Sequence, residues 1–165
     1  MKGYLMQEQA FVPGEDNFIE SFSPENNYGV VFEDDGETGY FYAVEKDKDG
    51  SGLRVLDALH IYEAAGFLAD KAAAAIGQTS VNPSEENAGS SEGKAGAADG
   101  ISPSKLLVIW SRDWMKCALV IDGRCQAIYD FETQGGYNIN EFPPPNDIWT
   151  RGDRKLTDEL IRKLF

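Results

Sequence analysis

The chain has 165 residues, of which 42% are hydrophobic and 12% aromatic. This is enough for one sizeable core and too little for two ordinary domains, so we expect a single domain over residues 1–165. The formal net charge of −13 argues against nucleic acid as a ligand, because phosphate binding requires positive charge. The N-terminus lacks the apolar run of a signal peptide and no stretch is long enough to span a bilayer. We therefore expect a cytoplasmic protein without membrane contact.

The acidic residues are concentrated in the first third of the chain. Residues 15–49 contain eleven Asp or Glu and two Lys, which gives a net charge of −9. Such a surface would attract a basic protein partner and speed its association at low salt. The alternative is that the acidity only keeps the chain in solution. Composition does not predict an oligomeric state.

The first strands are expected at residues 18–22, 28–34 and 37–44. The last two form the best hairpin signal, because the Asp35-Gly36 pair between them favours the positive φ angles of a tight turn.

A two-residue loop in this hairpin would pair Val30 with Phe41 on one face and Val31 with Tyr40 on the other. Both faces are apolar. The pattern predicts a hairpin that is either covered on both sides or exposes an aromatic patch.

Residues 47–52, DKDGSG, open like a calcium-binding loop, with oxygen-bearing side chains at loop positions 1, 3 and 5 and glycine at 6. Position 12, where such a loop needs a bidentate glutamate, is Ala58. The preceding aromatic and β-branched residues favour a strand. We therefore expect a glycine-rich loop between two strands.

The next strand is expected at residues 53–62. Simple alternation puts His60 and Tyr62 on one face and Asp57 and Leu59 on the other, which argues against an Asp–His catalytic pair.

An insertion is predicted over residues 64–103. It begins with an alanine-rich helical segment that starts near residue 63 and continues into low-complexity sequence. The small and polar residues of 79–100 cannot bury enough apolar surface to offset their ordering entropy, so we expect this part to be flexible.

The second half returns to a strand pattern, with strands expected at 105–111, 115–121 and 125–131. A three-residue loop at 121–123 would give the last two strands a common apolar face, comprising Met115, Cys117, Leu119, Cys125, Ala127 and Tyr129.

Cys117 and Cys125 flank this turn at a separation that disfavours a disulfide, so we expect both to be reduced. His60 is the single histidine and no CxxC spacing occurs, so neither a zinc site nor any cofactor is predicted.

The C-terminal part combines an extended segment with a helix. Three prolines within residues 140–149 forbid a helix or an interior strand there. A helix is expected at 156–165, with Thr157 as its N-cap, acidic residues in its first turn and basic residues in its last, and it should cover one sheet face. The predicted fold class is α+β: mainly antiparallel β-sheet with a C-terminal helix and a flexible insertion.

Two groups of residues are candidates for binding. The first is an acidic cluster at the first hairpin turn: Glu33, Asp34, Asp35 and Glu37. These carboxylates could hold a divalent cation or serve acid–base chemistry, but side chains at a turn tip tend to splay apart in solvent. The second group is aromatic, because partly exposed aromatic side chains form binding hot spots: Tyr40, Tyr42 and Trp114.

No nucleophile elbow, P-loop or dinucleotide fingerprint occurs, so no catalytic residue is assigned.

The chain resembles the bacterial family DUF2251 in four segments, in this order: YGVVFEDDGETGYFYAVE, VLDALHIY, LVIWSRDWMKCALVIDGRCQAIYDFE and FPPPNDIW. The resemblance excludes the N-terminus and residues 64–103, and its extension to the last helix is left open. It implies a small bacterial domain and brings no known activity.

The sequence as a whole favours an acidic binding protein, in the form of an immunity-type inhibitor that covers a basic toxin or nuclease. The alternative is a metal-dependent hydrolase that uses the acidic cluster at the hairpin.

Overall fold

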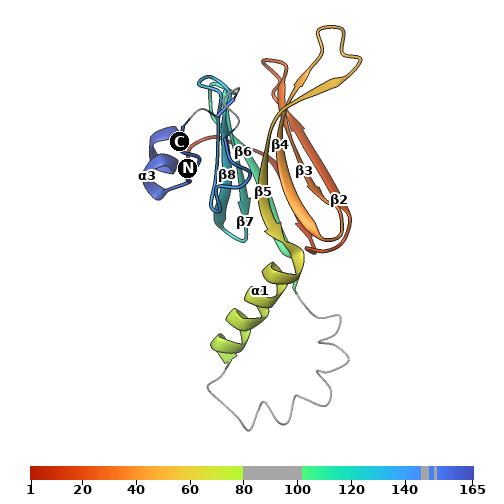
Figure 1. Ribbon diagram of the computed structural model, residues 1–165, viewed down its shortest axis with the longest axis vertical. Coiled ribbons are helices and arrows are strands. Elements are labelled where there is room, and N and C mark those ends of the chain that lie inside the picture. The colour runs from red at the N-terminus through yellow and green to blue at the C-terminus, as the bar shows by residue number, and fades with distance from the viewer. Residues whose placement is uncertain (80–101, 146–148, 151) are drawn as a thin grey trace.

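Two antiparallel β-sheets pack face to face (Figure 1). The computed structural model describes residues 1–79, 102–145, 149–150 and 152–165. One sheet has the strand order β2-β3-β4-β5: β2 (Asn17–Phe22), β3 (Tyr28–Asp34), β4 (Thr38–Lys46) and β5 (Leu53–Glu63). The other has the order β1-β6-β7-β8-β9: β1 (Tyr4–Phe11), β6 (Ser104–Trp110), β7 (Lys116–Ile121), β8 (Arg124–Asp130) and β9 (Gly135–Asn138). The predicted class, mainly antiparallel sheet with a C-terminal helix, is confirmed.

The core lies between the two sheets and is rich in aromatic rings. Phe41 of β4 stacks on Tyr129 of β8 with ring centroids 5.3 Å apart, and the Tyr129 hydroxyl donates to the Phe41 carbonyl at 2.6 Å. Trp110 is fully buried, and its indole N–H donates to Ser21 Oγ at 3.0 Å across the sandwich. Each buried polar group of these side chains thus has a partner, as burial in a low-dielectric core requires.

The β3–β4 hairpin has the predicted faces in a different register. Phe32 pairs with Phe41 and Val31 with Tyr42, two residues away from the pairing expected for a two-residue loop. The connection is Asp35-Gly36-Glu37, because the Asp35 side chain accepts hydrogen bonds from the Glu37 and Thr38 N–H groups and holds a wider turn. A shift of two residues keeps every side chain on its predicted face.

The β7–β8 hairpin differs from the prediction in its turn and in its strand register. Its turn is the two-residue Asp122-Gly123, with φ angles of 51° and 80°, and not a three-residue loop. A register shift after Leu119 then pairs it with Ala127. The predicted common face of these strands is therefore correct near Leu119, whereas Cys125 pairs with Val120 and lies on the other face.

Strand β5 departs from simple alternation at two register shifts. Ile61 and Leu56 are skipped in the pairing with β4, so that Gly39 pairs with Tyr62, Tyr40 with His60, and Val44 with Val55. Tyr62 therefore faces the core beside Leu59, contrary to the alternation prediction. The loop 47–52 joins two strands, as predicted.

Strand β1 was not predicted from the sequence. Among the described strands it lies at the edge of its sheet and pairs with β6 alone, and most of its side chains are exposed, so its sequence needs little apolar alternation. A register shift between Leu5 and Gln7 further blurs its pattern.

Two helices complete the described chain. Helix α1 (Ala64–Thr79) follows β5 directly and extends beyond one end of the sandwich, while the β4–β5 hairpin projects from the other end (Figure 1). Helix α3 (Asp158–Leu164) begins at its predicted N-cap, Thr157, whose Oγ1 accepts from the Leu160 N–H at 3.1 Å. It lies on the outer side of the β1-β6-β7-β8-β9 sheet (Figure 1). The predicted low-complexity part of the insertion falls mainly at 80–101, outside the described residues.

Candidate binding surface

The outer face of the β2–β5 sheet carries an unusual set of side chains for a solvent-facing surface. Pairing across the strands puts eight of them together, and we call this set the β2–β5 outer face: Phe18, Val31, Glu33, Tyr40, Tyr42, Val44, Leu53 and Val55. No helix or strand within the described ranges lies over it (Figure 1). Phe18 is 62% exposed, Val55 60% and Leu53 46%. Large apolar side chains grouped in this way mark an interaction site more often than scattered ones do.

The bulge in β5 creates part of this face. Because the pairing skips Leu56, Val55 turns outward beside Val44, and Leu53 follows opposite Lys46. Regular alternation from Asp57 would have placed both side chains toward the core. The outer face therefore gains two exposed apolar groups, Leu53 and Val55, that uninterrupted alternation would place on the other side.

A shallow groove of about 280 Å³ runs across the face. Its floor is formed by the buried side chains of Val31 and Val44, and Phe18, Glu33 and Tyr42 line one end. Tyr42 stacks on Tyr40 with ring centroids 5.9 Å apart. Burial raises the pKa of the Tyr42 hydroxyl, and the nearby Glu33 charge raises it further. The predicted binding residues Glu33, Tyr40 and Tyr42 thus lie together on one surface.

The other acidic residues of the predicted cluster lie elsewhere. Asp34 points into the molecule, where its carboxylate accepts from the Tyr62 hydroxyl at 2.6 Å and from the Gly14 N–H at 2.9 Å. Asp35 caps the hairpin turn, and the backbone N–H groups that it accepts lower the pKa of its carboxyl. Glu37 is exposed at the same turn. The four carboxylates therefore do not converge on a common point.

Trp114, the remaining predicted binding residue, belongs to a different part of the molecule. It is half-buried at the edge of the core, stacked on Tyr4 with a centroid distance of 4.9 Å and tilted against Trp110. Its φ angle of 61° is held by the turn around Asp113, whose side chain accepts from the Met115 N–H and the Ser111 hydroxyl. The structure does not bring this indole together with Tyr40 and Tyr42.

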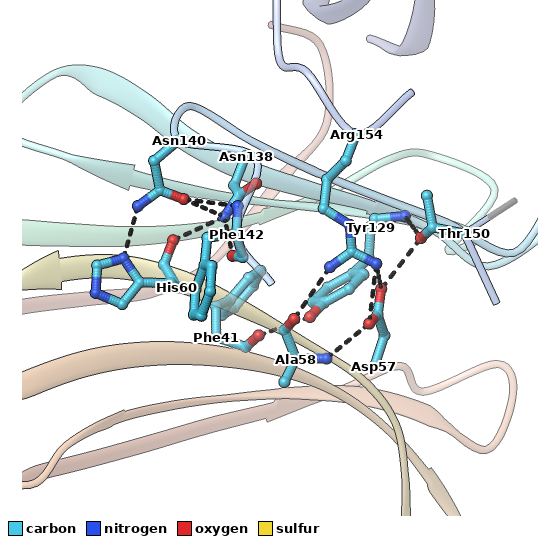
Figure 2. Close-up of polar contacts among 11 residues, drawn as sticks. Phe41, Asp57, Ala58, His60, Tyr129, Asn138, Asn140, Phe142, Thr150 and Arg154 are labelled. Carbon is cyan, nitrogen blue, oxygen red and sulfur yellow. Dashed lines mark hydrogen bonds and ion pairs between the residues drawn. The ribbon is translucent and has the colours of Figure 1, made fainter. Parts of the chain in front are cut away.

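A second polar cluster lies inside, where β5 meets the C-terminal segment (Figure 2). The Arg154 guanidinium, 1% exposed, donates to both oxygens of Asp57, itself 6% exposed, at 3.0 and 3.2 Å. Asp57 also accepts from the Thr150 hydroxyl at 3.2 Å and the Ala58 N–H at 2.9 Å. Arg154 donates in addition to the Ala58 carbonyl at 3.1 Å. This buried ion pair and its additional hydrogen bonds link β5 to the C-terminal segment, since Asp57 and Arg154 are 97 positions apart in the sequence.

Asn138 of β9 makes further hydrogen bonds between the edge of β5 and the C-terminal segment. Its amide nitrogen lies within hydrogen-bonding distance of the His60 and Phe142 carbonyls, at 2.8 and 2.9 Å (Figure 2). The His60 N–H donates to the Phe142 carbonyl at 2.9 Å. The part of the β5 edge around His60 is therefore already hydrogen-bonded, and it is closed to a further strand. Within the described chain, Asn138 Oδ1 and Arg154 Nε are the buried side-chain atoms left without a hydrogen-bond partner.

The arrangement does not assemble a recognisable catalytic group from the described residues. Asp57 faces the interior and His60 the outer side, as alternation between them predicts. Both cysteines are free; burial raises the pKa of the Cys125 thiol to about 12 and that of Cys117 well above its usual value, which disfavours a reactive thiolate.

Among the residues that the structure describes, no group of three His, Cys, Asp or Glu is placed to hold a metal ion. None of the helices in that part of the chain has the length and hydropathy needed to cross a bilayer.

The described residues form a β-sandwich with an apolar and aromatic candidate binding face that includes the carboxylate of Glu33. The chain belongs to the family described as "Uncharacterized protein conserved in bacteria (DUF2251)", so the resemblance noted in the sequence is confirmed. The family model matches residues 11–81 and 94–165, and it therefore covers the last helix and parts of 64–103 that the sequence segments left out. It is also similar to an uncharacterized protein of Haemophilus influenzae, with 31% identity over 127 residues. The matched part is 76% of this chain and 59% of that relative. The chain thus spans less than two thirds of the relative's length. No solved structure matches the chain.

Proposed function

We propose that this chain is a protein-binding domain that docks a basic partner on the β2–β5 outer face, in the manner of an immunity-type inhibitor of a basic toxin or nuclease. The observation that carries the proposal is the uncovered outer face itself, with Phe18 and Val55 about 60% exposed on a sheet whose opposite face forms the core. A patch with an apolar centre and charged surroundings is typical of a protein interface.

The charge around this face favours a basic partner. Residues 15–63, which include all four strands of the sheet, contain thirteen acidic and three basic side chains, hence −10 of the total −13. Two of the three basic groups are already engaged: Arg54 pairs with Glu45, and the Lys46 ammonium lies over the Phe22 ring at 4.4 Å. The surface therefore presents excess negative charge, which speeds encounter with a positively charged protein.

The geometry favours docking on the face over addition of a strand. The β5 edge is partly paired by the C-terminal segment, and at the opposite edge Gln7 Nε2 donates to the Glu20 carbonyl of β2 at 3.2 Å. The face itself remains open in the described structure. A partner would thus contact side chains of alternating residues across several strands.

The proposal is tested with purified basic proteins encoded by the genes next to this one, because an inhibitor of this kind is normally encoded beside its target. Isothermal titration calorimetry with the wild-type chain should give a dissociation constant of about 1 μM or tighter. Val55→Arg should weaken binding roughly 100-fold, because it replaces an exposed apolar contact of the proposed interface with a positive charge that repels a basic partner. Co-expression should also protect cells from the partner's toxicity.

Ala72→Arg is the matched control, because it adds the same charge at an exposed position of α1, away from the face. It should leave the affinity unchanged. The proposal is wrong if no such basic protein binds, or if Val55→Arg and Ala72→Arg weaken binding equally.

A further inference from the structure

The groove on the β2–β5 outer face has one carboxylate, that of Glu33, in a lining that is otherwise apolar or aromatic. It runs diagonally across the sheet, from Phe18 and Glu33 on β2 and β3 to Val55 and Leu53 on β5. The floor, Val31 and Val44, offers no hydrogen-bonding side chain. The groove has a volume of about 280 Å³, at the lower limit of the range of small-molecule pockets, roughly 300–1,000 Å³, and it is open to solvent. It suits a single long side chain.

Glu33 is half-buried, and within the described chain no cation or donor lies within ion-pair or hydrogen-bonding distance of its carboxylate. A partly desolvated carboxylate without a partner gains strongly from an incoming cation. The rings of Phe18 and Tyr42 line the same end of the groove, and aromatic faces attract cations as well. The negative end of the groove and its aromatic rings therefore favour the same kind of ligand.

Building on the proposed function, we infer that the groove receives one arginine side chain of the basic partner. The guanidinium would pair with Glu33 and stack against the rings of Phe18 and Tyr42, while its aliphatic stem lies over Val31 and Val44. Arginine fits better than lysine because its planar, weakly hydrated head matches a carboxylate bidentately and stacks on rings. A second copy of this chain is a poor occupant, because it would bring two strongly acidic sheets face to face.

The inference is tested with a small probe, Nα-acetyl-arginine amide, by methyl NMR of the valine and leucine residues. Titration should shift the signals of Val31, Val44 and Val55 with a dissociation constant in the millimolar range, as one side chain allows. The neutral citrulline analogue, which has nearly the same shape, should bind at least ten times more weakly. The lysine analogue should bind more weakly than arginine.

Two variants locate the charge. Glu33→Gln should lower the affinity for the arginine probe at least tenfold, whereas Glu37→Gln, which removes one charge from the exposed turn nearby, should change it less than twofold. A dispersed spectrum of each variant shows that it is folded. Absence of shifts in the groove, equal binding of citrulline, tighter binding of lysine, or equal effects of the two variants would each overturn the inference.

The two proposals fail separately. If a basic partner binds in a Val55-dependent way but the arginine probe does not shift the groove signals, the docking face stands and the arginine assignment is wrong. If the probe binds through Glu33 but no neighbouring basic protein does, the groove chemistry stands and the proposed partner is wrong.

Discussion

At the scale of single residues, two consecutive carboxylates have opposite environments. Glu33 faces the outer groove and has no ion-pair or hydrogen-bond partner among the described residues, while Asp34 points inward and accepts from the Tyr62 hydroxyl and the Gly36 N–H. Successive side chains of a strand alternate between its faces, so neighbours in sequence are separated by the thickness of the sheet. The three consecutive acidic residues therefore have three different roles. Glu33 lies on the surface, Asp34 accepts hydrogen bonds inside the molecule, and Asp35 caps the hairpin turn.

The buried ion pair gives the sharpest prediction at this scale. Asp57→Asn keeps the size of the side chain but leaves the Arg154 guanidinium buried without a counter-charge. We expect the free energy of unfolding to fall by about 3–5 kcal/mol, measured by urea denaturation with tryptophan fluorescence. Asp153→Asn is the control: that side chain is exposed, its oxygen can still accept from the Lys155 N–H, and stability should change by less than about 0.5 kcal/mol. Equal effects of the two substitutions would contradict a structural role for the pair.

At the scale of elements, the bulges of β5 determine which residues are buried. Skipping Ile61 turns Tyr62 into the core, and skipping Leu56 turns Val55 out to the groove. The inward turn of Tyr62 packs its ring against the backbone of β4 at Gly39, where a Cβ atom would lie 2.8 Å from the ring. The ring cannot retreat easily, because its hydroxyl is held by Asp34.

Gly39→Ala should therefore lower the midpoint temperature of thermal unfolding, with a loss of about 1–3 kcal/mol in the free energy of unfolding from overpacking. Gly66→Ala in α1 is the matched control, because nothing lies within 4 Å of the added methyl group. In a helix this change should stabilise by up to about 1 kcal/mol. Scanning calorimetry of both variants decides the matter: if Gly39→Ala is as stable as Gly66→Ala, the close approach of Tyr62 is not rigid.

The elements could be predicted from sequence to an uneven degree. Strands with a strong run of apolar and β-branched residues, such as β3 and β7, and the N-cap at Thr157 were predicted because each rests on local chemistry. The edge strand β1 was missed because exposed edge residues need little apolar pattern. Registers and bulges were missed because they depend on which neighbouring strand a residue meets.

At the scale of the whole molecule, a net charge of −13 at pH 7 opposes the folded state by self-repulsion. Raising NaCl from about 0.02 to 0.5 M should screen this repulsion and raise the midpoint temperature of thermal unfolding at pH 7. Near pH 4.4, where the net charge is zero, the same increase in salt should have much less effect. Differential scanning fluorimetry at the two pH values tests this. A salt effect of equal size at both would show that screening of net charge is not its cause.

The sequence by itself determined the antiparallel class, the family, the acidic first third and the candidates Glu33, Tyr40 and Tyr42, because these follow from composition, motif and the two-residue period of strands. The tertiary structure alone decided that Asp34 and Asp57 face the interior, that Trp114 lies apart, and that Phe18, Leu53 and Val55 join the outer face. The physical reason is that a side chain's exposure depends on the register of its strand and on what the opposite sheet covers. Both arise from contacts between residues far apart in the chain.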